Sequence, residues 1–131
     1  MTTGEEKPNR APAINGVHTM FYYENLPRAT EWYDRIGFEN VLRLEFVSIF
    51  RLSSSSYLSL VDGHHGSQRP VKKKGAILSI ETTDLEGWHR HLFTKDVEGV
   101  GVGLDIGCGG RTVEFKLIDP EGYTLEFFQW L

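Results

Sequence analysis

The sequence has little cysteine and no long hydrophobic run. Its one cysteine, Cys108, has no partner within the chain, so packing must stabilise the fold, as is usual in a reducing compartment such as the cytoplasm. No apolar run approaches the roughly 18–20 residues that a membrane-spanning helix needs. Charges and prolines stand in the N-terminal segment where a signal peptide would have its apolar stretch. We therefore expect a cytoplasmic protein with no membrane partner.

Positive charge is also scarce. The chain has 14 Lys and Arg residues against 18 Asp and Glu residues, which gives a formal net charge of -4. A general nucleic-acid binder needs a basic face to offset the phosphate charges. The longest basic run, Lys72 to Lys74, is more typical of a solvated loop than of an anion site. We therefore expect no nucleic-acid partner.

Apolar residues are sufficient for a single core. The chain has 131 residues, of which 40% are hydrophobic and 12% aromatic, and this length and composition are typical of one globular domain. Residues 1–13 are predicted to form a disordered tail, and residues 14–131 the domain.

The order of the predicted elements begins with a strand, a helix and three more strands. Residues 16–23 are rich in β-branched and aromatic side chains, which favours a strand. Asn25 can cap a helix that carries Pro27 in its first turn and stops at Gly37. The three short apolar runs that follow, at 41–44, 47–50 and 57–61, predict strands.

The same order then repeats. Residues 75–81 predict a strand, and Asp84 can cap a second helix. Strands are predicted at 97–104, 111–118 and 123–130, and the residues between the last two, Asp119-Pro120-Glu121-Gly122, each occupy their preferred place in a type I turn.

The chain is therefore predicted to be an α+β protein with two tandem βαβββ modules. Module one spans 14–62, a linker spans 63–74 and module two spans 75–131. Roughly 50–60 residues are too few for either module to bury a core alone, so the two should share one. The alternative is an ordinary α+β domain whose element order repeats by chance.

These features together resemble the vicinal oxygen chelate superfamily, which includes glyoxalase I, extradiol dioxygenases, fosfomycin-resistance enzymes and bleomycin-resistance proteins. The resemblance rests on the paired modules, on the first-strand segment Gly16–Met20, and on the closing pattern Asp-Pro-x-Gly-x-x-x-Glu at 119–126. It covers residues 14–131. It implies sheets that curl into a shared cup, with a pocket between modules paired within one chain or across a dimer.

The resemblance also implies where a divalent metal would bind. Metal-using members place one ligand on the first strand and one on the last strand of each module. His18 and Glu126 match two of these positions, and imidazole and carboxylate both bind Zn, Ni, Mn or Fe. The repeat places Ile77, or Ala76 if the glycines are aligned, opposite His18, and Ser59 opposite Glu126. Two of the four expected ligands are therefore missing.

The remaining histidines do not supply the missing ligands. His64 and His65 lie in the linker and match no common metal spacing. His89 and His91 are two positions apart on a predicted helix, so they point to different faces. His89 is expected to pack at the edge of the core.

Two classes of function remain open, with a vestigial pocket as a third. The first is a metal-assisted glyoxalase-like or dioxygenase-like enzyme, with His18 and Glu126 as catalytic residues and metal ligands, or as a metal-free acid/base pair. The second is a metal-free protein that sequesters a small ligand, as bleomycin-resistance proteins do. A homodimer is expected because aromatic residues exceed what two short helices can cover. The expected substrate pocket comprises Tyr57, Ser59, Phe50 and Phe115.

Overall fold

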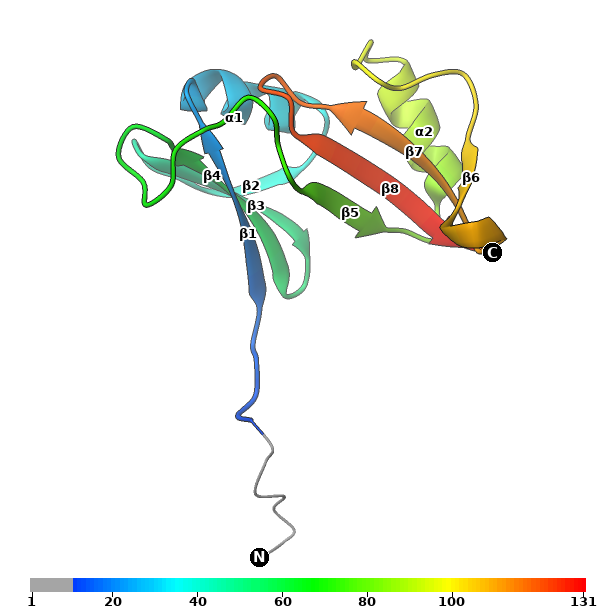
Figure 1. Cartoon of the computed structure of the whole chain (residues 1–131), viewed down its shortest axis with the longest axis horizontal. Helices are drawn as coiled ribbons and strands as arrows, with labels where there is room; N and C mark the ends of the chain where they lie inside the picture. Colours follow the sequence, from blue (N-terminus) through cyan, green and yellow to red (C-terminus); the bar gives the residue numbers. More distant parts are fainter. Residues whose placement is uncertain (1–10) are drawn as a thin grey trace, which may run out of the picture.

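The computed structural model describes residues 11–131, which form two four-stranded sheets with one helix each (Figure 1). Residues 1–10 of the expected tail lie outside this range, and residues 11–13 are exposed and have no regular structure. Within residues 11–131 no helix combines the length and the hydropathy needed to span a membrane.

Sheet one belongs to the first module. Its strands are β1 (Val17–Tyr23), β2 (Glu39–Arg43), β3 (Val47–Ser53) and β4 (Ser56–Asp62), in the order β1-β4-β3-β2. β1 runs parallel to β4, and the other two pairs are antiparallel. The helix α1 (Leu26–Arg35) connects β1 to β2.

Sheet two has the same construction. Its strands are β5 (Ile77–Glu81), β6 (Asp105–Gly107), β7 (Thr112–Ile118) and β8 (Thr124–Trp130), in the order β5-β8-β7-β6. The helix α2 (Leu85–Phe93) follows β5, and a short 3₁₀ turn, η1 (Cys108–Gly110), follows β6. The predicted repeat of two βαβββ modules is therefore confirmed.

Both helices begin at the predicted caps. The Asn25 side chain accepts a hydrogen bond from the Arg28 N–H at 3.1 Å, and Asp84 accepts one from the Gly87 N–H at 3.0 Å. These bonds satisfy N–H groups that have no partner inside the helix. Gly37 follows the end of α1 with a φ of +102°, a conformation that glycine adopts without steric cost.

The strand predicted at 97–104 does not form. Val97 is buried, but Gly99 has a φ of +93° and turns the chain away from an extended path. Val102 is almost fully exposed, and the second strand of this module forms later, as β6. Glycines at 99, 101 and 103 weaken the strand tendency that the valines between them would otherwise give.

One core spans both modules, as expected. The buried side chains of each sheet lie on the face covered by its helix, and Phe38 links the two sets through edge-to-face contacts with Trp88 of α2 and Phe127 of β8. We call the opposite face of each sheet its open face. The open face of sheet one carries His18, Met20, Arg51, Tyr57 and Ser59; that of sheet two carries Ile77, Ser79, Glu114, Lys116, Glu126 and Trp130.

Candidate functional site

A cleft of about 720 Å³ lies between the two modules. β1 and β5, which are edge strands of their sheets, line it from opposite sides, and Figure 1 shows the two sheets side by side at this point. The tip of the β3–β4 hairpin and Tyr57 contribute to the wall of module one, and residues 78–83 form the wall of module two. The volume is in the range of small-molecule sites, roughly 300–1,000 Å³.

His18 lies beside the module-one wall. Its ring stacks on Tyr57 with the centroids 4.6 Å apart, and its Nδ1 is 3.4 Å from the Ser59 hydroxyl. Tyr57 lines the cleft, whereas Ser59 is buried next to His18. Because β1 and β4 pair in parallel with His18 opposite Tyr57, the strand register itself brings the two rings together.

Glu126 lies beside the module-two wall, and both of its carboxylate oxygens have partners. The Ser79 hydroxyl donates to Oε1 at 2.7 Å, and Lys116 Nζ is 3.3 Å from Oε2. Lys116 also donates to Glu114 at 2.8 Å. These contacts, the one with Glu114 first, raise the pKa of Lys116, and the bond from Lys116 lowers the pKa of Glu114. Glu126 is therefore part of a charge-paired network.

The structure does not bring His18 and Glu126 together in one chain. They lie on the open faces of different sheets, and none of the hydrogen bonds or ion pairs of residues 11–131 joins them. Nor does this part of the chain contain three or more His, Cys, Asp or Glu side chains arranged to hold a metal ion.

Strand register identifies the equivalent of Glu126 in module one. In sheet one Met20 pairs with Ser59, and at the same place in sheet two Ser79 pairs with Glu126. Ser59 therefore occupies the position of Glu126, as the sequence alignment of the modules predicts. A neutral hydroxyl is a weak ligand for a divalent metal.

Helix caps identify the equivalent of His18 in module two. His18 stands seven residues before the α1 cap, Asn25, and the residue seven before the α2 cap, Asp84, is Ile77. This settles the choice between Ile77 and Ala76. An alkyl group cannot bind a metal, so the donor set of one chain does not fit a four-ligand metal centre.

Phe50 and Phe115 do not belong to the site, contrary to the prediction from sequence. Phe50 is fully buried and contacts Tyr33 of α1. Phe115 is also buried and stacks on Phe127 beneath α2. Both side chains point to the helix-covered faces, because neighbouring residues of a strand alternate between the two faces of a sheet.

Arg51 is an open-face residue in contact with the cleft residue Tyr57, and sequence reasoning missed it. Its Nη1 donates to the Tyr57 hydroxyl at 2.9 Å, and its guanidinium lies over the Tyr57 ring. The alternation along residues 47–53 contains the signal, since Ser48 and Phe50 are buried while Arg51 falls on the other face.

The other histidines have partners away from the cleft. His89 bonds the Gly101 carbonyl at 2.7 Å and packs edge-on against Phe115, which confirms its expected packing role. His91 bonds the carbonyl of Ile36 at 2.9 Å and so connects α2 to the end of α1.

The turn between β7 and β8 joins the modules. Asp119 is buried, and its Oδ2 accepts hydrogen bonds from the hydroxyls of Tyr23 at 2.5 Å and Tyr33 at 2.9 Å. Its Oδ1 accepts from the backbone N–H groups of Glu121 and Tyr123. The closing sequence pattern therefore has a structural role, because it ties module two to β1 and α1.

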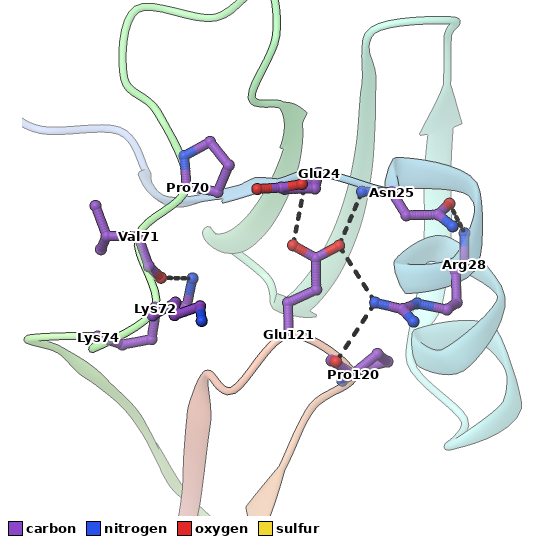
Figure 2. Close-up of a pocket in the computed structure, with 9 residues that line it drawn as sticks. All are labelled: Glu24, Asn25, Arg28, Pro70, Val71, Lys72, Lys74, Pro120 and Glu121. Carbon is purple, nitrogen blue, oxygen red and sulfur yellow. Dashed lines mark hydrogen bonds and ion pairs between the residues drawn. The ribbon is translucent and has the colours of Figure 1, made fainter.

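Glu121 extends this joint into a second cavity of about 610 Å³. Figure 2 shows its carboxylate between the start of α1 and the Arg28 side chain. The N–H groups of Glu24 and Asn25 each donate to it at 2.8 Å, and Arg28 lies 3.5 Å away. The anion that a helix N-terminus favours is thus supplied by the protein itself. Lys72 and Lys74 of the linker line the same cavity.

Several solved structures are similar to this architecture. A lactoylglutathione lyase from Agrobacterium tumefaciens is similar with a TM-score of 0.71 and 18% identity, over 90% of this chain and 95% of that one. A glyoxalase/bleomycin resistance protein/dioxygenase from Alicyclobacillus acidocaldarius has a TM-score of 0.71 and 17% identity, over 95% of this chain and 94% of that one. A glyoxalase/bleomycin resistance protein from Catenulispora acidiphila has a TM-score of 0.68 and 18% identity, over 88% of this chain and 98% of that one.

Sequence comparison adds nothing to these likenesses. No protein-family model matches the chain, and no curated protein matches it significantly. The structural likenesses cover nearly the whole of each chain and agree with the duplicated βαβββ modules. The protein therefore has the fold of the glyoxalase/bleomycin resistance/dioxygenase proteins.

Proposed function

We propose that this protein binds a small organic molecule in the cleft between its modules and does so without a resident metal ion. The observation that carries the proposal is the donor set at the four equivalent positions. His18 and Glu126 can bind a metal, but Ser59 and Ile77 stand at the other two positions. Glu126 is in addition occupied by Ser79 and Lys116.

The structural neighbours support a small-molecule ligand. Their names combine an enzyme of lactoylglutathione with bleomycin resistance, so this fold serves both catalysis and binding. For the present chain the bound group would contact Tyr57 on one wall and Ser79 on the other. Ligand binding in a cleft between two modules is a common arrangement for such sites.

Calorimetric titration with bleomycin and with S-lactoylglutathione tests the proposal. We expect saturable binding of at least one of them, with the same affinity in the presence and absence of EDTA. The substitution Val17→Trp fills the cleft and should weaken binding, whereas Ile14→Trp places the same side chain on an exposed residue before β1 and should not. Absence of binding by both probes, or binding abolished by EDTA, would contradict the proposal.

The competing function is a metal-dependent lyase or dioxygenase-like enzyme that uses Zn, Ni, Mn or Fe. In that case His18 and Glu126 would be ligands, with water or substrate at the remaining positions. Metal content after purification without chelator distinguishes the two. Metal that is retained by the wild type and lost in both His18→Ala and Glu126→Gln would favour the enzyme.

We also propose a cytoplasmic location and a homodimer. Cys108 is exposed and unpaired within residues 11–131, which suits a reducing compartment. The dimer is proposed because large apolar side chains, including Met20, Ile77 and Trp130, are exposed on the open faces.

A further inference from the structure

Four polar side chains form a row across the whole of sheet one. Strand pairing places His18 of β1 opposite Tyr57 of β4, Tyr57 opposite Arg51 of β3, and Arg51 opposite Glu39 of β2. We call these residues the cross-strand row. Contacts join each neighbour to the next: the ring stack of His18 on Tyr57, the Arg51–Tyr57 hydrogen bond at 2.9 Å, and the 3.5 Å approach of Arg51 Nε to Glu39.

Three groups that can donate a hydrogen bond lie on the open face, with the role of the His18 ring set by its tautomer. The Tyr57 oxygen accepts from Arg51 Nη1, so the phenolic proton of Tyr57 is available to donate. Arg51 Nη2 and His18 Nε2 have no hydrogen-bond partner among the residues that the structure describes. The Ser59 contact at Nδ1 positions the imidazole ring.

The two walls of the cleft differ in charge. The module-one side offers the Arg51 guanidinium and the hydroxyl of Tyr57, and Tyr57 itself lines the cleft. The module-two wall has the carboxylate of Glu81, whereas Glu126 lies outside the cleft lining and is paired with Lys116. An anionic group of a bound molecule would therefore be attracted to Arg51 and repelled by Glu81.

We propose that His18, Tyr57 and Arg51 form a subsite for an oxyanion, such as a carboxylate, on the open face of sheet one, where Tyr57 connects the row to the cleft. The proposal rests on the proposed function and specifies its ligand class. Arg51 supplies the charge, because a planar guanidinium matches the two oxygens of a carboxylate. Glu39 holds the guanidinium in place, and since Glu39 is two-thirds exposed, its charge is largely screened by solvent.

NMR titration with three matched probes tests this subsite. Benzoate carries a carboxylate, benzamide is its neutral isostere, and benzylamine is a cation on the same ring. We expect benzoate to shift the backbone amide signals of His18, Arg51 and Tyr57 in a saturable way. Benzamide should bind about tenfold or more weakly, because a hydrogen bond to a charged group contributes roughly 1.5–3 kcal/mol.

Variants separate the subsite from general effects of charge. Arg51→Met keeps the aliphatic stem and should lower the affinity for benzoate about tenfold or more. Arg51→Lys keeps the charge without the planar group, so its affinity for benzoate should lie between those of Arg51→Met and the wild type. Arg43→Met removes an equal charge from β2, where Arg43 pairs with Asp34 outside the row, and should have no effect. Glu39→Gln should strengthen benzoate binding.

The outcomes distinguish this subsite from the proposed function. Equal binding of benzoate and benzamide, or an unchanged affinity in Arg51→Met, overturns the oxyanion subsite. If benzylamine alone shifts the signals of cleft residues, the cleft still binds small molecules, and only the ligand class is wrong. If the calorimetric probes also fail to bind, the proposed function falls as well.

Discussion

Asp119 is the residue on which the joint between the modules depends. Its carboxylate accepts four hydrogen bonds, two from tyrosine hydroxyls of module one and two from the backbone of its own turn. In Asp119→Asn an amide group replaces one acceptor, and a buried hydroxyl loses its partner. We expect a loss of about 1–3 kcal/mol in the free energy of unfolding, measured by urea denaturation.

Tyrosine-to-phenylalanine substitutions provide the matched comparison. Tyr33→Phe removes one bond to Asp119 and should cost about 1–2 kcal/mol. Tyr22→Phe removes an exposed contact with Ser67 and should leave stability within about 0.5 kcal/mol of the wild type. Equal effects of the two substitutions would show that the Asp119 joint contributes little.

The same cluster predicts how stability depends on alkaline pH. Burial, and next the negative charges of neighbouring groups including Asp119, raise the pKa of Tyr23 and Tyr33 well above the ordinary value of 10.0. Unfolded tyrosines lose their protons near pH 10, whereas the folded protein keeps them. Stability should therefore be intact below about pH 10 and decrease as the pH rises further.

Circular dichroism across this alkaline range checks the expectation. Tyr33→Phe removes one of the two buried hydroxyls, so its stability should decrease less steeply with pH than that of the wild type. Tyr22→Phe should follow the wild-type curve, because Tyr22 remains outside the cluster. A wild-type curve that is flat above pH 10 would contradict the pKa assignment.

At the scale of elements, the end of α1 is held against α2 at Gly37. Gly37 has a φ of +102°, and a Cβ added there would lie 3.0 Å from Nε2 of His91, the atom that bonds the Ile36 carbonyl. Gly37→Ala should therefore cost about 1–2 kcal/mol or more, since a side chain is strained in this conformation and must also displace His91. Chemical denaturation measures the change.

Gly75→Ala is the control for this prediction. Gly75 has no positive φ, and a Cβ built on it meets no atom within 4 Å. Its substitution should be neutral or slightly stabilising, because alanine restricts the unfolded chain. If both substitutions lowered the free energy of unfolding by similar amounts, the contact between the end of α1 and α2 would not explain the effect of Gly37→Ala.

Local signals predicted most of these elements but not all of them. Asn25, Asp84 and the 119–122 turn act through contacts within a few residues, and each was correctly interpreted from sequence. The segment 97–104 was not, because its valines favour a strand while its glycines favour turns. Three-dimensional packing of Val97 decides the outcome, and the sequence contains no local measure of it.

The site was harder to predict than the elements. Phe115 alternates with Glu114 and Lys116, so the burial pattern of β7 was present in the sequence and would have excluded Phe115 from an open face. The contact of Arg51 with Tyr57 depends on the register of β3 against β4, including an irregularity between residues 51 and 53. Such a register is a property of the paired strands.

At the scale of the whole molecule, the distribution of apolar surface bears on assembly. The dimer prediction rests on five aromatic residues, which differ in exposure. Phe50 and Phe115 are buried within the chain, Trp32 is partly buried against the core, and Phe46 and Trp130 are about half exposed. Met20 and Ile77 are also half exposed. Exposed apolar side chains on the open faces of both sheets are typical of a surface that another copy covers.

The homodimer remains a prediction, and light scattering at concentrations of tens of micromolar tests it. Each chain has a mass of 14.9 kDa, so a dimer should give about 30 kDa. Ile77→Glu places a charge on the open face of β5 and should shift the mass toward that of one chain, because an unpaired charge is costly to bury in an interface. Val102→Glu puts the same charge on an 88% exposed residue of the loop before β6 and should leave the mass unchanged. A wild-type mass of one chain at these concentrations would contradict the homodimer, and any ligand in the cleft would then contact a single chain.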